Sequence, residues 1–164
     1  MEFRKASRND LKAVTAIFQA AVHHMDEQGI PQWDELYPAE EDLKGDILRS
    51  EMMLGLENGA PVCTYTLNRD CDPEYATGTW QYSGPDFRVL HRLCVSPSCQ
   101  HRGIAAQAMD YFEEMLRAEG CRALRLDVFS RNPYALRLYE NRGFRRVGEA
   151  QWRKGLFYLY EKVL

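Results

Sequence analysis

The chain has 164 residues, 45% hydrophobic and 27% charged, which predicts one globular domain over residues 1–164 with a core of ordinary size. Its net charge of -3 argues against a nucleic-acid or anionic-membrane surface, and leaves open a local basic cluster of Arg102, Arg122 and Arg125. The five cysteines include no Cys-x-x-Cys pair, which favours free thiols over a disulfide framework or a zinc site. No segment resembles a signal peptide or approaches the ~18 apolar residues of a membrane span, so we expect a cytoplasmic protein without metal.

The chain opens with a short strand around Phe3, followed by a helix. Ser7 and Asp10 have the spacing of a capping box at the start of that helix. Apolar residues at helical spacing follow, until Gly29 and Pro31 end the helix.

A second helix, a hairpin and a long connection are predicted next. The helix covers residues 40–49, with Leu43, Ile47 and Leu48 on its buried side. Two β-rich runs joined by residues 57–59, an Asn-Gly turn signal, form the hairpin. Residues 69–86 lack a clear period and form a long connection, with a short strand near Trp80.

The second half continues the alternation of strands and helices. Strands are expected over residues 88–95, 123–129, 144–148 and 156–163, and Asn132 with Pro133 opens a short helix that Gly143 closes. The helix after the first of these strands has an apolar face of Ile104, Ala108, Met109, Phe112, Met115 and Leu116. Its opposite face carries Gln107, Asp110, Glu113, Glu114 and Arg117. This order predicts an α/β domain: a mixed central sheet of six or seven strands flanked by helices on both faces.

The stretch LHRLCVSPSCQHRGIA, residues 90–105, joins a strand to a helix through a short polar loop. A helix start leaves backbone N–H groups without intrahelical partners and carries the positive end of the helix dipole. A phosphate can therefore bind there without a dedicated lysine, and Gly103 lets the backbone come close to it. The simpler alternative is that Gly103 only begins a helix beside a polar turn.

Two motifs in this half carry a resemblance to a known family. Residues 100–105 match the pattern Gln/Arg-x-x-Gly-x-Gly/Ala, and residues 132–144, NPYALRLYENRGF, match Asn-x-x-Ala-x-x-Leu-Tyr-x-x-x-Gly-Phe. Over residues 88–148 the chain resembles the GNAT family of N-acetyltransferases, and more loosely in its N-terminal part. One departure is Ala105, where many members have glycine. The resemblance implies the GNAT fold, in which the strands at 88–95 and 123–129 splay apart to admit the pantetheine arm of acetyl-CoA, the co-substrate.

The resemblance also implies which residues contact coenzyme A. These are the strand residues Leu93, Cys94 and Val95, the loop residues Gln100, His101, Arg102, Gly103, Ile104 and Ala105, and Asn132 and Tyr134. The backbone of the loop would hold the pyrophosphate, and the side chains of Gln100 and Arg102 are candidate helpers. For Asn132, a plain helix cap before Pro133 is at least as good a reading.

Acetyl transfer to an amine needs an acid for the leaving thiolate and a base for the amine. Tyr139 matches the family position of the general acid, and a phenol is protonated at neutral pH. His91 resembles the strand histidine of the arylalkylamine acetyltransferases, where it helps to deprotonate the amine. The equal alternative is a buried, hydrogen-bonded histidine that only fills the strand, with an ordered water as the base. A ping-pong mechanism through Cys94 or Cys99 has no His/Asp partner pattern to support it.

By family precedent, the segment between the first two helices, residues 29–37, covers the acceptor. Trp33, Asp34 and Glu35 would suit a cationic amine, with Trp80 closing the other side, although Trp33 could equally plug the edge of the core. The sequence thus predicts acetyl-CoA-dependent N-acetylation of a small-molecule or peptide amine, by a monomer or homodimer. The alternative is a non-catalytic acyl-CoA-binding module. A nucleotide-binding protein is disfavoured, because neither Gly-x-Gly-x-x-Gly nor Gly-x-x-x-x-Gly-Lys-Ser/Thr occurs.

Overall fold

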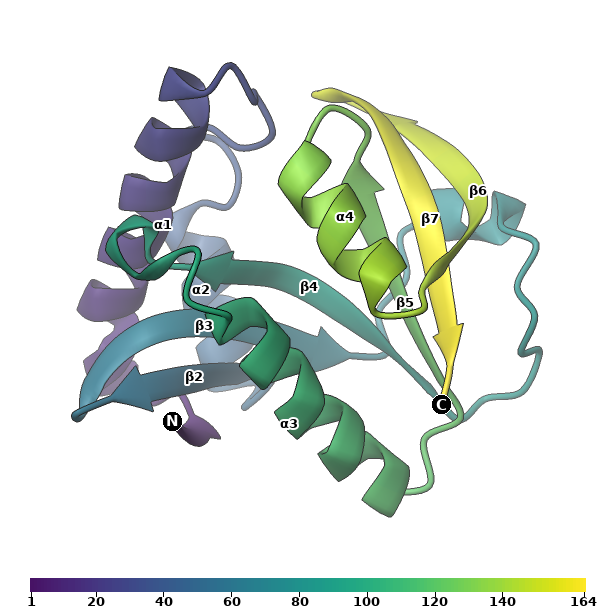
Figure 1. Cartoon of the computed structure of the whole chain (residues 1–164), viewed down its shortest axis with the longest axis horizontal. Helices are drawn as coiled ribbons and strands as arrows, with labels where there is room; N and C mark the ends of the chain where they lie inside the picture. Colours follow the sequence, from purple (N-terminus) through teal and green to yellow (C-terminus); the bar gives the residue numbers. More distant parts are fainter. The chain divides into compact units, whose positions relative to one another are not determined.

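The computed structural model describes residues 1–164 and contains seven strands, four helices and three short 3-10 turns. The strands are β1 (Glu2–Lys5), β2 (Met52–Glu57), β3 (Ala60–Asn68), β4 (Phe87–Val95), β5 (Ala123–Phe129), β6 (Arg145–Trp152) and β7 (Gly155–Val163). The helices are α1 (Leu11–Glu27), α2 (Glu40–Leu48), α3 (Ile104–Ala118) and α4 (Pro133–Asn141), and the 3-10 turns are η1 (Arg8–Asp10), η2 (Pro73–Thr77) and η3 (Pro97–Cys99). The seven strands form one mixed sheet in the order β1-β2-β3-β4-β5-β7-β6, which confirms the predicted α/β class (Figure 1).

The chain divides into two compact units. The first consists of Met1–Leu67 and Arg92–Tyr111, and the second of Asn68–His91 and Phe112–Leu164. Strand β4 contributes residues to both units. The predicted site residues are likewise distributed over both units.

The first unit begins with the predicted capping box. The Asp10 carboxylate accepts hydrogen bonds from the backbone N–H of Ser7 (2.7 Å) and from its hydroxyl (2.8 Å), while the backbone N–H of Asp10 donates to the Ser7 carbonyl. Both oxygens of Asp10 also accept from the Arg4 guanidinium at 2.8 Å. These bonds satisfy donors that a helix start leaves open, and α1 follows directly.

The predicted hairpin of β2 and β3 is confirmed. Its turn residues Asn58 and Gly59 have φ of 50° and 78°, the left-handed conformations that a two-residue hairpin turn needs and that Asn-Gly adopts readily. The strands pair from Glu57↔Ala60 to Met52↔Thr66. The hairpin places alternate residues of β2 in the core of the first unit.

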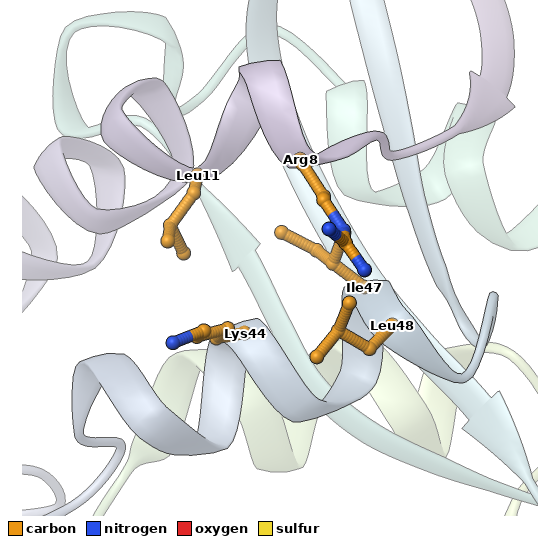
Figure 2. A pocket seen from close by; sticks show the side chains of 5 residues that line it. All are labelled: Arg8, Leu11, Lys44, Ile47 and Leu48. Atoms are coloured by element: carbon orange, nitrogen blue, oxygen red, sulfur yellow. The ribbon is translucent and has the colours of Figure 1, made fainter.

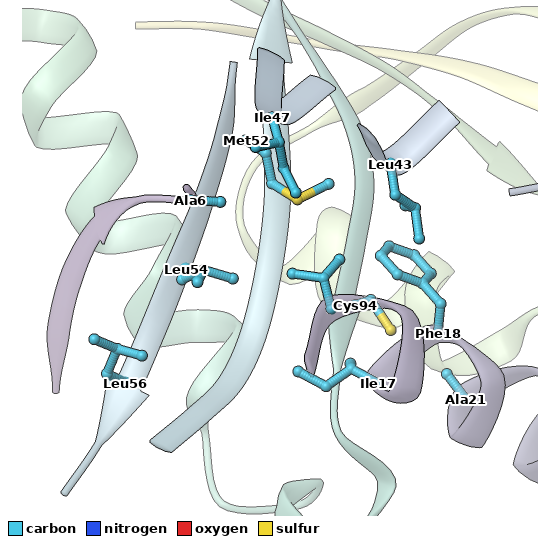
Figure 3. Packing of buried hydrophobic residues seen from close by; sticks show 11 residues of the cluster. Ala6, Ile17, Phe18, Ala21, Leu43, Ile47, Met52, Leu54, Leu56 and Cys94 are labelled. Atoms are coloured by element: carbon cyan, nitrogen blue, oxygen red, sulfur yellow. The ribbon is translucent and has the colours of Figure 1, made fainter. Parts of the chain in front are cut away.

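That core lies between β2 and helices α1 and α2 (Figure 3). Its buried members are Ala6, Val14, Ile17, Phe18, Ala21, Leu43, Ile47, Met52, Leu54, Leu56 and Cys94. Burying each large apolar side chain stabilises the fold by about 1.5–3 kcal/mol. Ala21, on the same face of α1, leaves room for the neighbouring aromatic and aliphatic groups.

One residue predicted on the buried side of α2 is not buried. Leu48 is 50% exposed, because it follows Ile47 directly and therefore lies about 100° further round the helix. It lines a pocket with Arg8, Leu11, Lys44 and Ile47 (Figure 2). The buried side of α2 instead includes Asp46, which is 1% exposed.

In the second unit, β5 pairs with β4 and β7, and β7 pairs with β6. The parallel pairing of β4 with β5 runs from Phe87↔Ala123 to Val89↔Arg125. It stops two residues before His91, where the second unit's part of β4 ends. Helix α4 packs against β5 (Figure 1).

The predicted strand near Trp80 is wrong. The connection contains the 3-10 turn η2, and the Trp80 indole N–H donates to the carbonyl of Tyr75 (2.8 Å), whose ring stacks on the indole at 5.5 Å. Tyr75 and Trp80 also pack against Val89, Ala150 and Leu159, so these aromatic residues belong to the core of the second unit and not to a strand. Neighbouring Thr79 still donates its backbone N–H to Val147 of β6 (2.8 Å).

The polar face predicted for the helix after β4 is wrong at one position. Glu113 is 3% exposed, and its carboxylate accepts from Lys162 Nζ (2.6 Å) and Arg117 Nη2 (3.2 Å). Residue spacing placed Glu113 on the solvent side. Its ion-pair partner on β7 lies far away in sequence and leaves no mark in the local pattern.

Candidate active site

The loop after β4 leads through η3 directly into α3, the strand–loop–helix order that the sequence predicted. After η3, His101 and Gly103 adopt φ of 59° and 74°, and α3 begins at Ile104. Left-handed residues within such a loop turn successive backbone N–H groups toward a common concave side, where an anion can bind. No atom lies within 4 Å of a Cβ built on Gly103, so it is the positive φ rather than lack of space that favours glycine here. The N–H groups of the first turn of α3 add to the same donor set.

The side chains of Gln100 and Arg102, predicted to help this loop hold a pyrophosphate, contact other groups of the protein. Arg102 Nη2 donates to both carboxylate oxygens of Glu57, at 2.9 and 3.2 Å. Gln100 Nε2 lies 3.4 Å from the carbonyl oxygen of Val95. His101 is exposed. In this structure the anion-binding potential of the loop therefore comes from its backbone.

Strand β4 contains an irregularity that the sequence did not reveal. Arg92 has φ of 53°, which interrupts the alternation of side chains along the strand. Strict alternation would place His91 on one strand face with Leu93 and Val95, and the left-handed residue between them breaks that rule. Beyond it, the backbone N–H of Ser96 donates to the carbonyl of Val62 on β3 (2.8 Å).

Cys94 and Cys99 are both free thiols. Cys94 lies in the core of the first unit, and burial raises the pKa of its thiol. A thiol kept neutral in this way is a poor nucleophile. The position of Cys94 therefore argues against a covalent acetyl intermediate on that residue.

In the second unit, Tyr139 lies on α4 and is 8% exposed, with its ring edge-on to Phe144 at 5.6 Å between centroids. Burial raises the pKa of Tyr139, and the nearby Asp127 carboxylate raises it further. The phenol therefore keeps its proton at any working pH. Two other buried tyrosines of this unit, Tyr75 and Tyr160, donate their hydroxyl protons to the carboxylates of Asp127 (2.7 Å) and Glu140 (2.8 Å).

At the start of α4, Asn132 caps the helix, which was the alternative to its predicted contact with coenzyme A. Its Oδ1 accepts from the backbone N–H of Ala135 (3.1 Å), and Pro133 occupies the first helical position. Tyr134 is 55% exposed.

His91, at the end of the second unit's part of β4, is half-buried, and its Nε2 lies 2.9 Å from Oδ1 of Asn68.

The segment predicted to cover the acceptor lies in the first unit. The Trp33 ring packs on Phe18, with 5.3 Å between ring centroids. It borders the core of the first unit, in line with the alternative that Trp33 plugs the edge of the core. Asp34 Oδ1 accepts from the backbone N–H groups of Leu36 (3.0 Å) and Tyr37 (3.2 Å), which closes the turn. Glu35 is exposed.

Trp80 packs against Arg125, one member of the basic cluster that the sequence left open. The guanidinium of Arg125 is stacked between the rings of Trp80 (4.3 Å) and Phe87 (3.9 Å), and its Nη2 donates to the carbonyl of Tyr82. Arg125 is 8% exposed and therefore does not belong to a surface basic cluster. The ring of Trp80 is engaged within the second unit.

Sequence reasoning missed residues whose partners are distant in the chain. Asp46 accepts from Arg92, Arg49 and Thr66, and Arg92 also donates to the Tyr37 hydroxyl (2.7 Å). Asn68, the partner of His91, was also missed, and nothing in the local pattern marks it. No three His, Cys, Asp or Glu side chains are grouped so as to hold a metal ion, and no helix is long and apolar enough to cross a membrane.

Comparison with known proteins places this arrangement in a family. A match to the Acetyltransferase (GNAT) family spans residues 19–144. A GNAT-family acetyltransferase from Streptococcus agalactiae 2603 has a TM-score of 0.86 at 20% identity, covering 99% of this chain and 95% of that chain. The PaiA N-acetyltransferase from Thermoplasma acidophilum, solved in complex with coenzyme A, has a TM-score of 0.74 at 18% identity, with coverages of 99% and 98%.

A third structure, the ribosomal-protein-alanine N-acetyltransferase from Brucella melitensis, has a TM-score of 0.73 at 18% identity and covers 100% of both chains. These likenesses show the fold, and the family match goes further. The chain belongs to the acetyltransferase (GNAT) family, whose members transfer an acyl group from acyl-coenzyme A to an amine acceptor.

Proposed function

We propose that the chain is an acetyl-CoA-dependent N-acetyltransferase acting, as one domain, on a primary amine of a small molecule or peptide. The observation that carries the proposal is Tyr139, a buried phenol whose pKa is raised, at the family position of the general acid. Acyl-CoA binding alone needs no such proton donor. The acid therefore favours catalysis over a non-catalytic binding module.

Residues 100–105 are the proposed site for the pyrophosphate of coenzyme A. The positive φ values of His101 and Gly103 and the start of α3 supply backbone N–H donors there, without any lysine. Leu93, Cys94 and Val95 would offer backbone groups to the pantetheine amides, and Tyr134 an exposed ring close to the cap residue Asn132.

The proposed reaction is direct attack of the amine on the thioester carbonyl carbon. A C–N bond forms, the C–S bond breaks, and the sulfur leaves with the proton of Tyr139, while His91 takes the proton that the nitrogen loses. The products are an N-acetylated amine and free coenzyme A. Proton exchange with solvent then restores both side chains.

The acceptor class is suggested by the segment before α2. Glu35, Leu36 and Tyr37 are exposed there, and an acidic group beside an aromatic ring suits an amine that is cationic before it reacts. The Brucella melitensis structure is described as a ribosomal-protein-alanine N-acetyltransferase, which makes a peptide amino group a reasonable candidate acceptor.

The proposal is tested by release of free thiol from acetyl-CoA across a panel of polyamines, arylalkylamines, aminoglycosides and short peptides with a free N-terminus. We expect at least one acceptor to release thiol in equal amount to an N-acetylated product identified by mass spectrometry. Calorimetry with coenzyme A is run in parallel. Binding of coenzyme A with no thiol release across the panel would support the non-catalytic module instead.

A further inference from the structure

The side-chain amide of Asn68 bridges His91 and a backbone N–H group in the second unit. Asn68 is the last residue of β3 and is 9% exposed. Its Oδ1 lies 2.9 Å from Nε2 of His91 and 2.9 Å from the backbone nitrogen of Asp70. Its Nδ2 lies 3.5 Å from Oδ2 of Asp70.

These contacts determine which end of the amide faces His91. Oxygen and nitrogen of an asparagine side chain can be exchanged without altering its shape, so their assignment depends on the partners. The backbone N–H of Asp70 can only donate, and therefore requires the oxygen. The same orientation points the amide nitrogen at the Asp70 carboxylate, which can accept from it.

The orientation of the amide in turn determines the tautomer of His91. An oxygen at 2.9 Å is an acceptor, so Nε2 must carry a hydrogen and donate. In the neutral imidazole one ring nitrogen carries the hydrogen and the other holds the basic lone pair. The lone pair of neutral His91 is therefore on Nδ1.

We propose that Asn68 is the positioning residue of this acetyltransferase: it holds His91 in the Nε2–H tautomer, so that Nδ1 is the atom that removes the proton of the amine. The inference rests on the proposed role of His91 as the base. When Nδ1 takes up a proton, the Nε2–H···Oδ1 bond is retained and becomes charge-assisted, so Asn68 also stabilises the imidazolium that forms. Asp70 is the charged group facing this amide, and its backbone N–H keeps the amide oriented throughout.

The tautomer is read directly by two-bond proton–nitrogen NMR correlation on histidine-labelled protein at pH 8, with the His91 signals assigned from a His91→Gln sample. We expect a protonated Nε2 and an unprotonated Nδ1, with the Nε2 proton protected from solvent exchange. Asn68→Ala should abolish that protection. A protonated Nδ1 in the unmodified protein overturns the inference.

Kinetics test whether the contact matters for the reaction, using acetyl-CoA and the panel amine with the highest turnover. Asn68→Ala should lower kcat by about 10-fold or more and leave the KM for acetyl-CoA unchanged. The matched variant is Asn68→Asp combined with Asp70→Asn, which keeps an acceptor for His91 without placing two carboxylates side by side. It should restore most of kcat. Thermal unfolding of each variant separates these effects from loss of the fold.

Two outcomes distinguish failure of the inference from failure of the proposed function. If His91→Gln lowers kcat but Asn68→Ala leaves it unchanged, Asn68 has no positioning role and the inference is wrong. If His91→Gln leaves kcat unchanged while thiol release persists, the enzyme is an acetyltransferase whose base is not His91, and the inference falls with that role alone.

Discussion

Arg92 and Asp46 form an ion pair in the interior of the first unit, with Nε of the guanidinium 2.9 Å from Oδ2 of the carboxylate. Asp46 also accepts from the hydroxyl of Thr66 (2.8 Å), and Arg92 also donates to the hydroxyl of Tyr37. The pair therefore ties strand β4, at the residue where its alternation breaks, to helix α2 and to the segment before that helix.

Asp46→Asn should lower the free energy of unfolding by about 3–5 kcal/mol, because it leaves the half-buried Arg92 without its counter-charge. Urea unfolding followed by tryptophan fluorescence measures the change. The control is Arg49→Ala, which removes an arm of the same cluster that is 52% exposed and should cost about 1 kcal/mol or less. If both variants lost the same free energy of unfolding, the buried ion pair would stabilise the fold no more than the exposed one.

Tyr139→Phe should lower kcat by about 10²-fold or more and leave the KM for acetyl-CoA unchanged, because the variant keeps the ring and removes only the proton donor. Steady-state thiol release measures both constants. Tyr160→Phe is the matched control: it removes a hydroxyl that donates to Glu140 and should leave kcat as it was. A full kcat in Tyr139→Phe would remove Tyr139 as the acid.

The stabilisation that Asp10 gives the folded protein should be lost in acid. The Arg4 guanidinium, with help from the Ser7 backbone N–H, holds the pKa of this carboxyl well below its usual range. A lowered pKa in the folded state contributes stability above the unfolded value of about 4, and that contribution is lost as the pH falls further. Asp10→Asn should therefore be less stable at pH 7, and its free energy of unfolding should fall less steeply below pH 4. Urea unfolding from pH 7 to pH 2 measures both; parallel curves for the two proteins would contradict the expectation.

Arg102 is predicted to assist coenzyme A binding only when released from Glu57. Both side chains are partly exposed, at 52% and 31%, so their pair is weak and a pyrophosphate can compete for the guanidinium. Glu57→Gln should lower the KM for acetyl-CoA by about 2- to 3-fold, and Arg102→Gln should raise it by a similar factor, since one charge-assisted bond is gained or lost. If neither variant changes KM, Arg102 is only half of a surface ion pair and the backbone alone holds the anion.

Features that depend on near neighbours were predictable from the sequence. The capping box of Ser7 and Asp10, the Asn58-Gly59 turn and the cap of α4 by Asn132 are each closed within three residues. Their energetics are local, so residue type and spacing suffice to place them. The sheet and its helices followed from the same kind of pattern.

Features whose partners lie far away in sequence were not predictable. Asp46 meets Arg92 across 46 positions and Glu113 meets Lys162 across 49, so the local pattern gave no sign of either ion pair. The positive φ of Arg92 has no glycine to signal it. At the candidate site, the motifs located the loop and Tyr139, but the partners of Arg102 and His91 depend on tertiary contacts that the motifs do not encode.

The carboxylate of Glu161 on β7 accepts the backbone N–H groups of Gln81, at 2.6 Å, and of Tyr82, at 3.3 Å. Gln81 precedes its acceptor by 80 positions. During synthesis on the ribosome, which proceeds from the N-terminus, this part of the connection has to wait for that acceptor until β7 has emerged. The order at Gln81 and Tyr82 therefore depends on a residue that is synthesised 80 positions later, and a chain released before residue 161 lacks this acceptor.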